Sequence, residues 1–425
     1  MKADLIINNA KGCSYTTDGK KTVFEAVAVK GDKIIAVGSN EDISQKANTA
    51  TKIIDAQGGT VTAGFCDSHL HASMLTQLQY SADIFNIVPG ENESRDAYTA
   101  RVLEKVKKFA DEHPELDIIR GTGFNPEAFR ALGSMLCAKD LDQVSTEKPV
   151  ILYSFCQHYI CVNSKALEMS GITKDTPLHP SCMVEKDGEG KPTGFFVEIS
   201  AQNLFLDSFE QADFSVEQYK AGILKFQEEY ARSNGVTSYF EALSRPNAIQ
   251  AYRELAESGT LKIRVKSWFL TDPTKSDEQF DEMIENKGKY DVGDMFRIDT
   301  IKFFFDGGEF TAMMKEPLEA DALLENGFSP DYLGPRLWEK ERLQKAFEKL
   351  TKAGYQIHIH VWGDRAVQEA LDLFEDMDNK GIEGHRHTLT HIALIDDSDI
   401  ARMKKYNVVA AMQPQWAEPN SFWEL

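Results

Sequence analysis

The feature that most constrains the fold is a regular alternation of apolar, strand-like segments with amphipathic, helix-like segments from about residue 215 onward. The strand-like segments are nearly continuous in apolar character, as expected of parallel strands that are buried on both faces. Together with the segment that leads into His69, seven can be counted, the last six being VTSYFEA, LKIRVKSWFL, RIDTIKFFFD, YQIHIHV, RHTLTHIAL and NVVAAMQP. Strands and helices in this order predict an α/β fold, a TIM (β/α)8 barrel with strands in parallel.

The helix-like segments between these strands carry one apolar face each. Before YQIHIHV, for example, Leu343, Phe347 and Leu350 recur at helical spacing, and Gly354 follows as a stop signal. Seven strands are one short of a closed barrel, and an open edge would leave backbone groups unpaired. We therefore expect an eighth strand beyond Leu425, in a longer protein of which this chain is a fragment.

The remaining segments divide the chain into three parts. Residues 1–62 contain short strands rich in β-branched residues and predict the N-terminal part of a small β-sandwich module. Residues 63–84 and 215–425 form the barrel. Residues 85–214 are an insertion after the first strand, with a helix near 97–112, a GTGFN loop at 121 and a strand PVILYSF. Insertions on barrel loops usually cover the active site.

The amino-acid composition indicates which classes of binding partner to expect. The 425 residues include 47 basic and 67 acidic side chains, a net charge of −20, which disfavours nucleic acids and anionic membranes. Charges interrupt every apolar run well before the roughly 20 residues that span a bilayer. Six cysteines without a CxxC pair favour reduced thiols in the cytoplasm. We expect a small-molecule substrate; the sequence leaves the oligomeric state open, a homo-oligomer included.

Histidines recur at the ends of three of the predicted strands. His69 and His71 are two residues apart, so a strand directs both imidazoles to one side. Such a pair alone could equally be two barrel-mouth histidines satisfied by hydrogen bonds. Two further strands, IHIHV and RHTLTH, also end in histidine. Three strands that deliver imidazoles to one rim predict a metal site.

Not every histidine is expected to bind the metal. His360 lies closer than His358 to the carboxyl end of its strand, and His391 ends the next strand, after His385 and His387. We therefore prefer His360 and His391 as ligands. By contrast, His113 and His179 lie in polar loops and are expected on the surface.

Lys302 stands inside the apolar strand IDTIKFFFD, where a buried ammonium group needs a partner. One interpretation is an ion pair with Asp299 or Asp306. The other is carboxylation of the amine by carbon dioxide, which would give two oxygens able to bridge two metals. Spacing alone favours the ion pair.

These features coincide with the motifs of a known family. The motifs occur in the family's order between Ala63 and Pro414 and read AGFCDSHLHA, GTGFN, SFCQHYICVNSKAL, PTGFFVE, GVTS, IKFFFDGG, IHIHVWGDRAV, LTHIALI and MQP. The chain thus resembles the amidohydrolase superfamily, and within it the YtcJ-like metal-dependent hydrolases related to N-substituted formamide deformylase. It departs from the family pattern at Phe124, at Thr390 and at Val361-Trp362, which are expected to reshape the pocket.

The resemblance implies a metal centre at the carboxyl ends of the barrel strands. Its ligand pattern falls on His69, His71, Lys302, His360 and His391, and it favours a carboxylated Lys302. The expected cofactor is a divalent metal, above all zinc, as one or two ions. Candidate substrate contacts are Phe124, His158, Asn163 and Gln413, of which the first three could equally pack the insertion.

The resemblance also implies an activity. A hydroxide activated by the metal would cleave an amide-type C–N bond, N-substituted formamides included. In the family an aspartate at the end of the eighth strand takes up the proton, so we expect the catalytic base beyond Leu425. The alternative is a non-catalytic metal-binding or ligand-binding barrel, or an inactive fragment that lacks this aspartate.

Overall fold

The computed structural model describes residues 1–16, 18–308, 311–325, 328–382 and 386–413. Its contacts divide the chain into two compact units. One comprises Met1–Cys66 with Gly235–Thr237, and the other comprises Asp67–Asn234 with Ser238–Leu425. No helix in the described ranges combines the length and the apolar character needed to cross a membrane.

The first unit consists of two small sheets and one short helix. A four-stranded sheet has the order β5 (Lys33–Gly38), β4 (Ala26–Lys30), β1 (Leu5–Asn8) and β6 (Lys52–Asp55). A three-stranded sheet has the order β3 (Lys21–Phe24), β2 (Lys11–Tyr15) and β7 (Thr60–Val61), and α1 spans Asn40–Ser44. Side chains of β1, β4 and α1 form its core, among them Ile6, Ala26 and Ile43.

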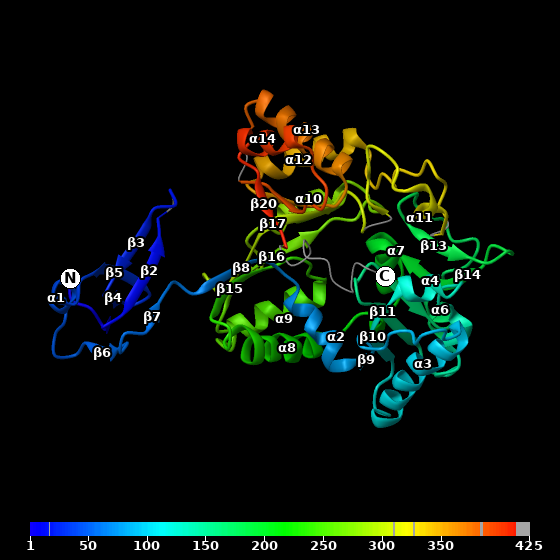
Figure 1. Ribbon diagram of the computed structural model, residues 1–425, viewed down its shortest axis with the longest axis horizontal. Coiled ribbons are helices and arrows are strands. Elements are labelled where there is room, and N and C mark those ends of the chain that lie inside the picture. The colour runs from blue at the N-terminus through cyan, green and yellow to red at the C-terminus, as the bar shows by residue number, and fades with distance from the viewer. Residues whose placement is uncertain (17, 309–310, 326–327, 383–385, 414–425) are drawn as a thin grey trace. The chain divides into compact units, whose positions relative to one another are not determined.

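A seven-stranded sheet forms the centre of the second unit (Figure 1). Its order is β8 (Phe65–Leu70), β15 (Val236–Glu241), β16 (Arg264–Leu270), β17 (Phe296–Phe304), β18 (Gln356–Val361), β19 (Thr388–His391) and β20 (Val409–Ala411). The pairings from β15 to β20 are all parallel. The seven predicted strands, and their order along the chain, are therefore confirmed.

The sheet is strongly curled. His69 on β8 lies 3.2 Å from His358 on β18, four strands away in the sheet order. Neighbouring strands are about 4.8 Å apart, so a flat sheet would separate these strands by about 19 Å. The contact therefore requires the sheet to bend round into an incomplete barrel, as the strand count predicted.

Helices connect the strands, and several of them share a hydrophobic core with the sheet. They are α8 (Val216–Lys225), which continues as the π-helix η3 (Phe226–Ala231), α9 (Pro246–Glu257), α10 (Glu278–Glu285), α11 (Ala320–Glu325), α12 (Lys340–Lys352), α13 (Asp364–Asn379) and α14 (Asp397–Lys405). In Figure 1, α12, α13 and α14 lie together beside the last strands. Leu343, Phe347 and Leu350 of α12 are buried in the core that these helices share with the strands, as their spacing predicted.

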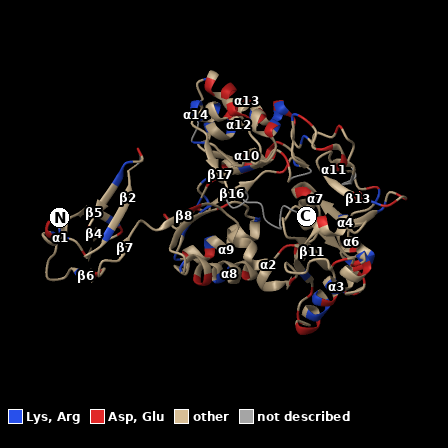
Figure 2. Cartoon of the chain, in the orientation of Figure 1, with Lys and Arg blue, Asp and Glu red and all other residues tan. Residues whose placement is uncertain are grey.

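The segment between β8 and α8 forms a sheet of its own. The 3₁₀-helix η1 (Ala72–Met74) and α2 (Leu75–Tyr80) follow β8, and the sheet has the order β13 (Met183–Lys186), β14 (Pro192–Val197), β12 (Tyr159–Val162), β11 (Val150–Ser154), β10 (Ile119–Phe124) and β9 (Ala82–Asp83). Its helices are α3 (Arg95–Glu112), α4 (Pro126–Ala131), α5 (Ala138–Leu141), α6 (Ser164–Ser170), α7 (Glu198–Leu206) and η2 (Glu210–Ala212). The GTGF residues expected in a loop belong to β10, because Gly121 and Thr122 pair with β11. Figure 2 shows acidic and basic residues interspersed along α3, whereas α13 carries mostly acidic ones.

Candidate active site

A pocket of about 450 Å³ opens at the carboxyl ends of the barrel strands. All five residues predicted as metal ligands line it, and they are His69, His71, Lys302, His360 and His391. They come from β8 or its end, β17, β18 and the end of β19. The structure thus brings together residues that are up to several hundred positions apart in the sequence.

The alternation of β18 explains how one strand serves both the pocket and the core. Ile357, Ile359 and Val361 point to the helices and are fully buried among them. His358 and His360 point to the opposite side, as the period of two requires. Of these two, only His360 is among the described residues that line the pocket.

Hydrogen bonds fix the orientation of His69. Its Nδ1 lies 3.2 Å from Nε2 of His358 and 3.2 Å from Oγ1 of Thr390. His358 in turn stacks on Trp268, with ring centroids 4.0 Å apart. The other nitrogen of His69, Nε2, is buried and has no hydrogen-bond partner among the residues that the structure describes, and the same is true of Nδ1 of His71. A buried polar atom without a partner is costly and calls for an explanation.

His360 and His391 are also held through one ring nitrogen. Nε2 of His360 donates to the carbonyl oxygen of Gly307 at 3.1 Å. Nδ1 of His391 donates to Oε1 of Gln413 at 2.8 Å, so the predicted contact residue Gln413 lies in the pocket beside a candidate ligand. Hydrogen bonds of this kind fix the tautomer and the direction of a metal-binding imidazole.

The spacing of these rings fits a shared metal ion. The ring centroids are 5.1 Å apart for His69 and His71, 5.1 Å for His69 and His391, and 4.5 Å for His360 and His391. Two imidazoles bound to one ion at about 2.1 Å have centroids about 5 Å apart. Over the described ranges, however, no three His, Cys, Asp or Glu side chains form an assembled metal site. The donors therefore fit a metal ion in type, spacing and unsatisfied atoms, without forming a complete cage.

Burial lowers the pKa of His69, His358, His360 and His391 far below the usual range, and the nearby Lys302 adds to the effect, for His360 after the neighbouring His391. Burial and Lys302 also lower the pKa of His71 to about 3. These shifts favour the neutral imidazole, which is the form that binds metals.

Lys302 is 1% exposed, and its burial lowers the pKa of the amine to about 7. Neither carboxylate considered from the sequence pairs with it. Asp299 forms an ion pair with Lys266 at 2.9 Å. Asp306 accepts backbone N–H groups of Met313, Trp362 and Gly363, which ties the ends of β17 and β18 together. Among the described contacts Lys302 has aromatic neighbours instead, with Nζ 4.8 Å from the ring centroid of Phe304.

His158 and Glu198 form a hydrogen-bonded pair beside the candidate ligands. His158 lines the pocket, 5.6 Å from His360 between ring centroids, and its Nδ1 lies 2.6 Å from Oε2 of Glu198. Glu198 also accepts hydrogen bonds from Oγ1 of Thr311 and the backbone N–H of Gly308. Although burial opposes both effects, this pair raises the pKa of His158 and lowers that of Glu198.

Backbone strain is concentrated at this site. Glu198 has a φ of +65° and His391 a φ of +74°, a region that side chains other than glycine rarely adopt. Strained residues of this kind cluster at functional sites, where the surrounding fold holds them in place.

Two predicted substrate contacts are not brought to the pocket. Phe124 is 1% exposed and packs against Phe129 and Phe195 in the core of the inserted sheet. The side chain of Asn163 caps α6 through the N–H of Ala166 and also accepts the N–H of Val150. Both side chains therefore stabilise the inserted segment, Phe124 by packing and Asn163 by hydrogen bonds, and neither lines the pocket described above.

The remaining histidines have structural or surface positions. His387 is buried and its Nδ1 accepts the backbone N–H of Ile357. His113 lies beside Glu115 in an exposed loop, and His179 contacts Ser181. His385 lies outside the described residues.

Three charged residues of the site were not predicted from the sequence. They are Glu198 and the ion pair of Asp213 and Arg245, which lines the pocket. Glu198 ends the motif PTGFFVE, so an acidic residue directly after an apolar strand was an available signal. Asp213 and Arg245 carry no such signal, because their partners lie on other elements.

A curled parallel sheet with a histidine-rich pocket at the carboxyl ends of its strands defines the class of α/β-barrel proteins with an active site at that face. Comparison with known families identifies the member of this class. Residues 52–423 match the model of the "Amidohydrolase family", and the chain belongs to this family. Membership supports hydrolase activity in general.

Individual relatives agree with this assignment. The chain is 27% identical to the putative amidohydrolase YtcJ of Bacillus subtilis (strain 168), over 97% of this chain and 74% of that protein. It is 23% identical to the N-substituted formamide deformylase of Arthrobacter pascens, over 99% and 75% of the two chains. An uncharacterized metal-dependent hydrolase from Pyrococcus furiosus has a similar structure, with a TM-score of 0.68 and 26% identity over 97% of this chain and 77% of that one. The resemblance inferred from the sequence motifs is confirmed.

Proposed function

We propose that the protein is a metal-dependent hydrolase that cleaves an amide-type C–N bond, N-substituted formamides included. The observation that carries the proposal is the pair of buried nitrogens, His69 Nε2 and His71 Nδ1, which have no hydrogen-bond partner among the described residues and lie in a pocket lined by further imidazoles. The names of the relatives, an N-substituted formamide deformylase and a metal-dependent hydrolase, support the reaction class.

His69, His71, His360, His391 and Lys302 would hold the metal. Imidazole and oxygen ligands favour zinc, although iron or manganese tolerate the same set. A bound divalent metal would polarise a carbonyl and lower the pKa of a bound water to about 7, which would supply a nucleophile at neutral pH.

Lys302 is proposed to be carboxylated. Burial lowers the pKa of its amine to about 7, so a large neutral fraction is available to react with carbon dioxide near neutral pH. The described ion pairs leave no carboxylate to Lys302, and a carbamate would give the buried side chain an oxygen donor. Mass measurement of the intact metal-loaded protein under carbon dioxide tests this, because an unmodified amine with metal bound refutes it.

The other pocket residues orient the imidazole rings and polarise the substrate carbonyl. Glu198 fixes Nδ1 of His158, so the remaining ring nitrogen is left for the substrate. The charge of Glu198 favours an imidazolium that donates a hydrogen bond to the carbonyl oxygen. Gln413 and Gly307 hold the rings of His391 and His360.

The test uses the full reading frame of the native gene. The metal content is measured first, and hydrolysis of N-formyl and N-acyl amines is then assayed before and after chelation and after zinc is restored. Turnover that depends on the metal supports the proposal. Bound metal without turnover of any amide contradicts it and supports the second candidate, a non-catalytic metal-binding barrel.

A further inference from the structure

Beyond the candidate ligands, the pocket wall is largely apolar. Side chains from both the barrel and the inserted segment contribute, and they are Leu70, Met74, Ile199, Leu206, Phe214 and Leu243. Neutral polar groups such as Gln77 and Gln202 lie between them. Such a wall is suited to an apolar substituent, and the charged groups set into it decide what else it accepts.

Among the described residues that line the pocket, Asp213 is the one acidic residue, and Arg245 is the one Lys or Arg apart from Lys302. They bind each other, with Nε of Arg245 2.9 Å from Oδ2 of Asp213. Oδ1 of Asp213 also accepts the hydroxyl of Tyr219 at 2.8 Å and the backbone N–H of Phe214 at 2.8 Å. The side chains of Asp213 and Arg245 are only 11% and 12% exposed.

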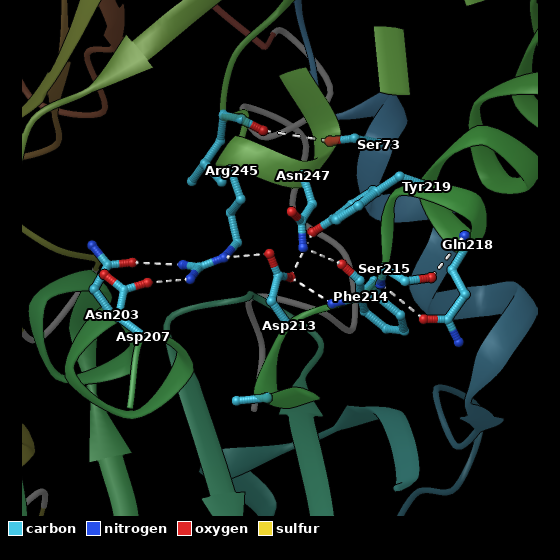
Figure 3. A network of polar contacts seen from close by, with 12 residues as sticks. Ser73, Asn203, Asp207, Asp213, Phe214, Ser215, Gln218, Tyr219, Arg245 and Asn247 are labelled. Carbon is cyan, nitrogen blue, oxygen red and sulfur yellow. Dashed lines mark hydrogen bonds and ion pairs between the residues drawn. The ribbon is translucent and has the colours of Figure 1, made fainter. Parts of the chain in front are cut away.

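The other end of the Arg245 guanidinium is occupied as well. Figure 3 shows it between Asp213 on one side and Asn203 and Asp207 on the other. Nη1 donates to Oδ1 of Asn203 at 3.0 Å, and Nη2 donates to Oδ1 of Asp207. An incoming carboxylate would therefore have to displace a protein carboxylate from Arg245.

His158 is the other polar group of the wall that can carry a charge, and a carboxylate of the protein compensates this charge as well. Glu198 lies directly behind it, at 2.6 Å, and is 1% exposed. Each charge that faces the substrate space, outside the candidate ligands, is thus compensated by an adjacent protein group. Nε of Arg245 makes no hydrogen bond among the described residues, but Oδ2 of Asp213 lies 2.9 Å from it. A charged substrate group would therefore lose its water and have to compete there with a protein group of its own sign or with that group's partner.

We infer that this pocket selects uncharged amides with an apolar N-substituent, and that the Asp213–Arg245 pair is the determinant that excludes carboxylate and ammonium groups. The inference rests on the proposed hydrolase function and adds the substrate class. It also assigns a role to Arg245 and Asp213, which contact the pocket but none of the candidate metal ligands in the described contacts.

Three substrates that share the same N-formyl-pentamethylene chain test the selectivity: N-formylhexylamine, N-formyl-6-aminohexanoate and N-formyl-1,5-diaminopentane. These differ only in the terminal group, which is neutral, anionic or cationic at neutral pH. For the full-length, metal-loaded protein we expect kcat/KM for the neutral compound to exceed both others by about 100-fold. Equal values, or preference for a charged compound, overturn the inference and leave the hydrolase function intact.

Variants test the assignment to the pair. Asp213→Asn leaves Arg245 less compensated and should raise kcat/KM for the anionic compound relative to the neutral one by at least about 10-fold. Arg245→Met leaves Asp213 uncompensated and should favour the cationic compound. The matched control is Arg253→Met on helix α9, which begins directly after Arg245. The exposed Arg253 side chain pairs with Glu257, and its loss should leave all ratios unchanged. Unchanged ratios in both pocket variants overturn the assignment.

A binding experiment separates failure of the inference from failure of the proposed function. If no compound is hydrolysed, calorimetric titration of the same three compounds still measures selectivity. Tighter binding of the neutral compound then supports the inference without the hydrolase function. Equal binding of all three, or tighter binding of a charged one, contradicts it.

Discussion

Nδ1 of His69 lies 3.2 Å from Nε2 of His358, although 289 residues separate them in the sequence and four strands separate them in the sheet. This contact shows that the sheet is curled, because it brings the edge strand β8 close to the fifth strand, β18. It also turns His69 so that Nε2, its unpartnered nitrogen, is the one left for a ligand. His358 thus contacts a candidate ligand without lining the pocket itself.

The two histidines of β18 are expected to differ in their effect on metal binding. Both are 2% exposed, so asparagine at either position changes burial equally. His360→Asn removes a pocket-lining donor and should lower zinc affinity by more than 100-fold. His358→Asn only loosens His69, and such orienting partners contribute about 10- to 100-fold. Zinc affinity by competition with a chelating dye measures both, and equal losses would argue against the ligand assignment.

Glu198→Gln should lower kcat by about 10- to 100-fold and leave the metal content unchanged, since supporting hydrogen bonds of this kind have effects of that size. The variant keeps the size of the side chain but removes the charge that supports His158. Glu185→Gln is the control, because Glu185 is exposed and bonds to Thr193. A Glu198→Gln enzyme with unaltered kcat would exclude this role.

Glu241 should make stability depend on pH. It is fully buried on β15, and its burial raises the carboxyl pKa from 4.5 to about 7, although Tyr252 and Ser73 donate hydrogen bonds to it. The folded state therefore binds this proton more tightly than the unfolded state. Its stabilising contribution is fully present below about pH 4.5 and is lost as the pH rises through about 7.

Glu241→Gln keeps an oxygen that can accept both hydrogen bonds and does not ionise. Between pH 4.5 and pH 8, the free energy of unfolding of the native protein should fall relative to this variant by on the order of 3 kcal/mol. Urea unfolding at a series of pH values measures the difference. A constant difference over this range would mean that Glu241 does not titrate as described.

Removal of metal should destabilise the fold. Without the ion, Nε2 of His69 and Nδ1 of His71 are left buried without a partner. A ligand present at about 1,000 times its Kd stabilises a protein by about 4 kcal/mol. Calorimetry should therefore show a lower Tm after chelation and recovery with zinc, and a smaller recovery in His71→Ala. A Tm that is insensitive to zinc would count against the metal centre.

The sequence by itself determined the barrel strands and several of their helices. Apolar runs bounded by turn residues mark β15 to β20, and the spacing of Leu343, Phe347 and Leu350 marks α12, because burial imposes a local period on each element. The same local logic located the histidines, since a residue at the carboxyl end of a parallel strand must lie at the rim.

Only the tertiary structure decided which side chains meet. The pairing of His158 with Glu198 and the contacts of Arg245 with Asp213 and Asn203 join elements that no local pattern connects. The inserted sheet and the strand β10 were missed for the same reason. Contacts of this kind depend on how the sheets curl and pack, and no periodicity along the chain encodes them.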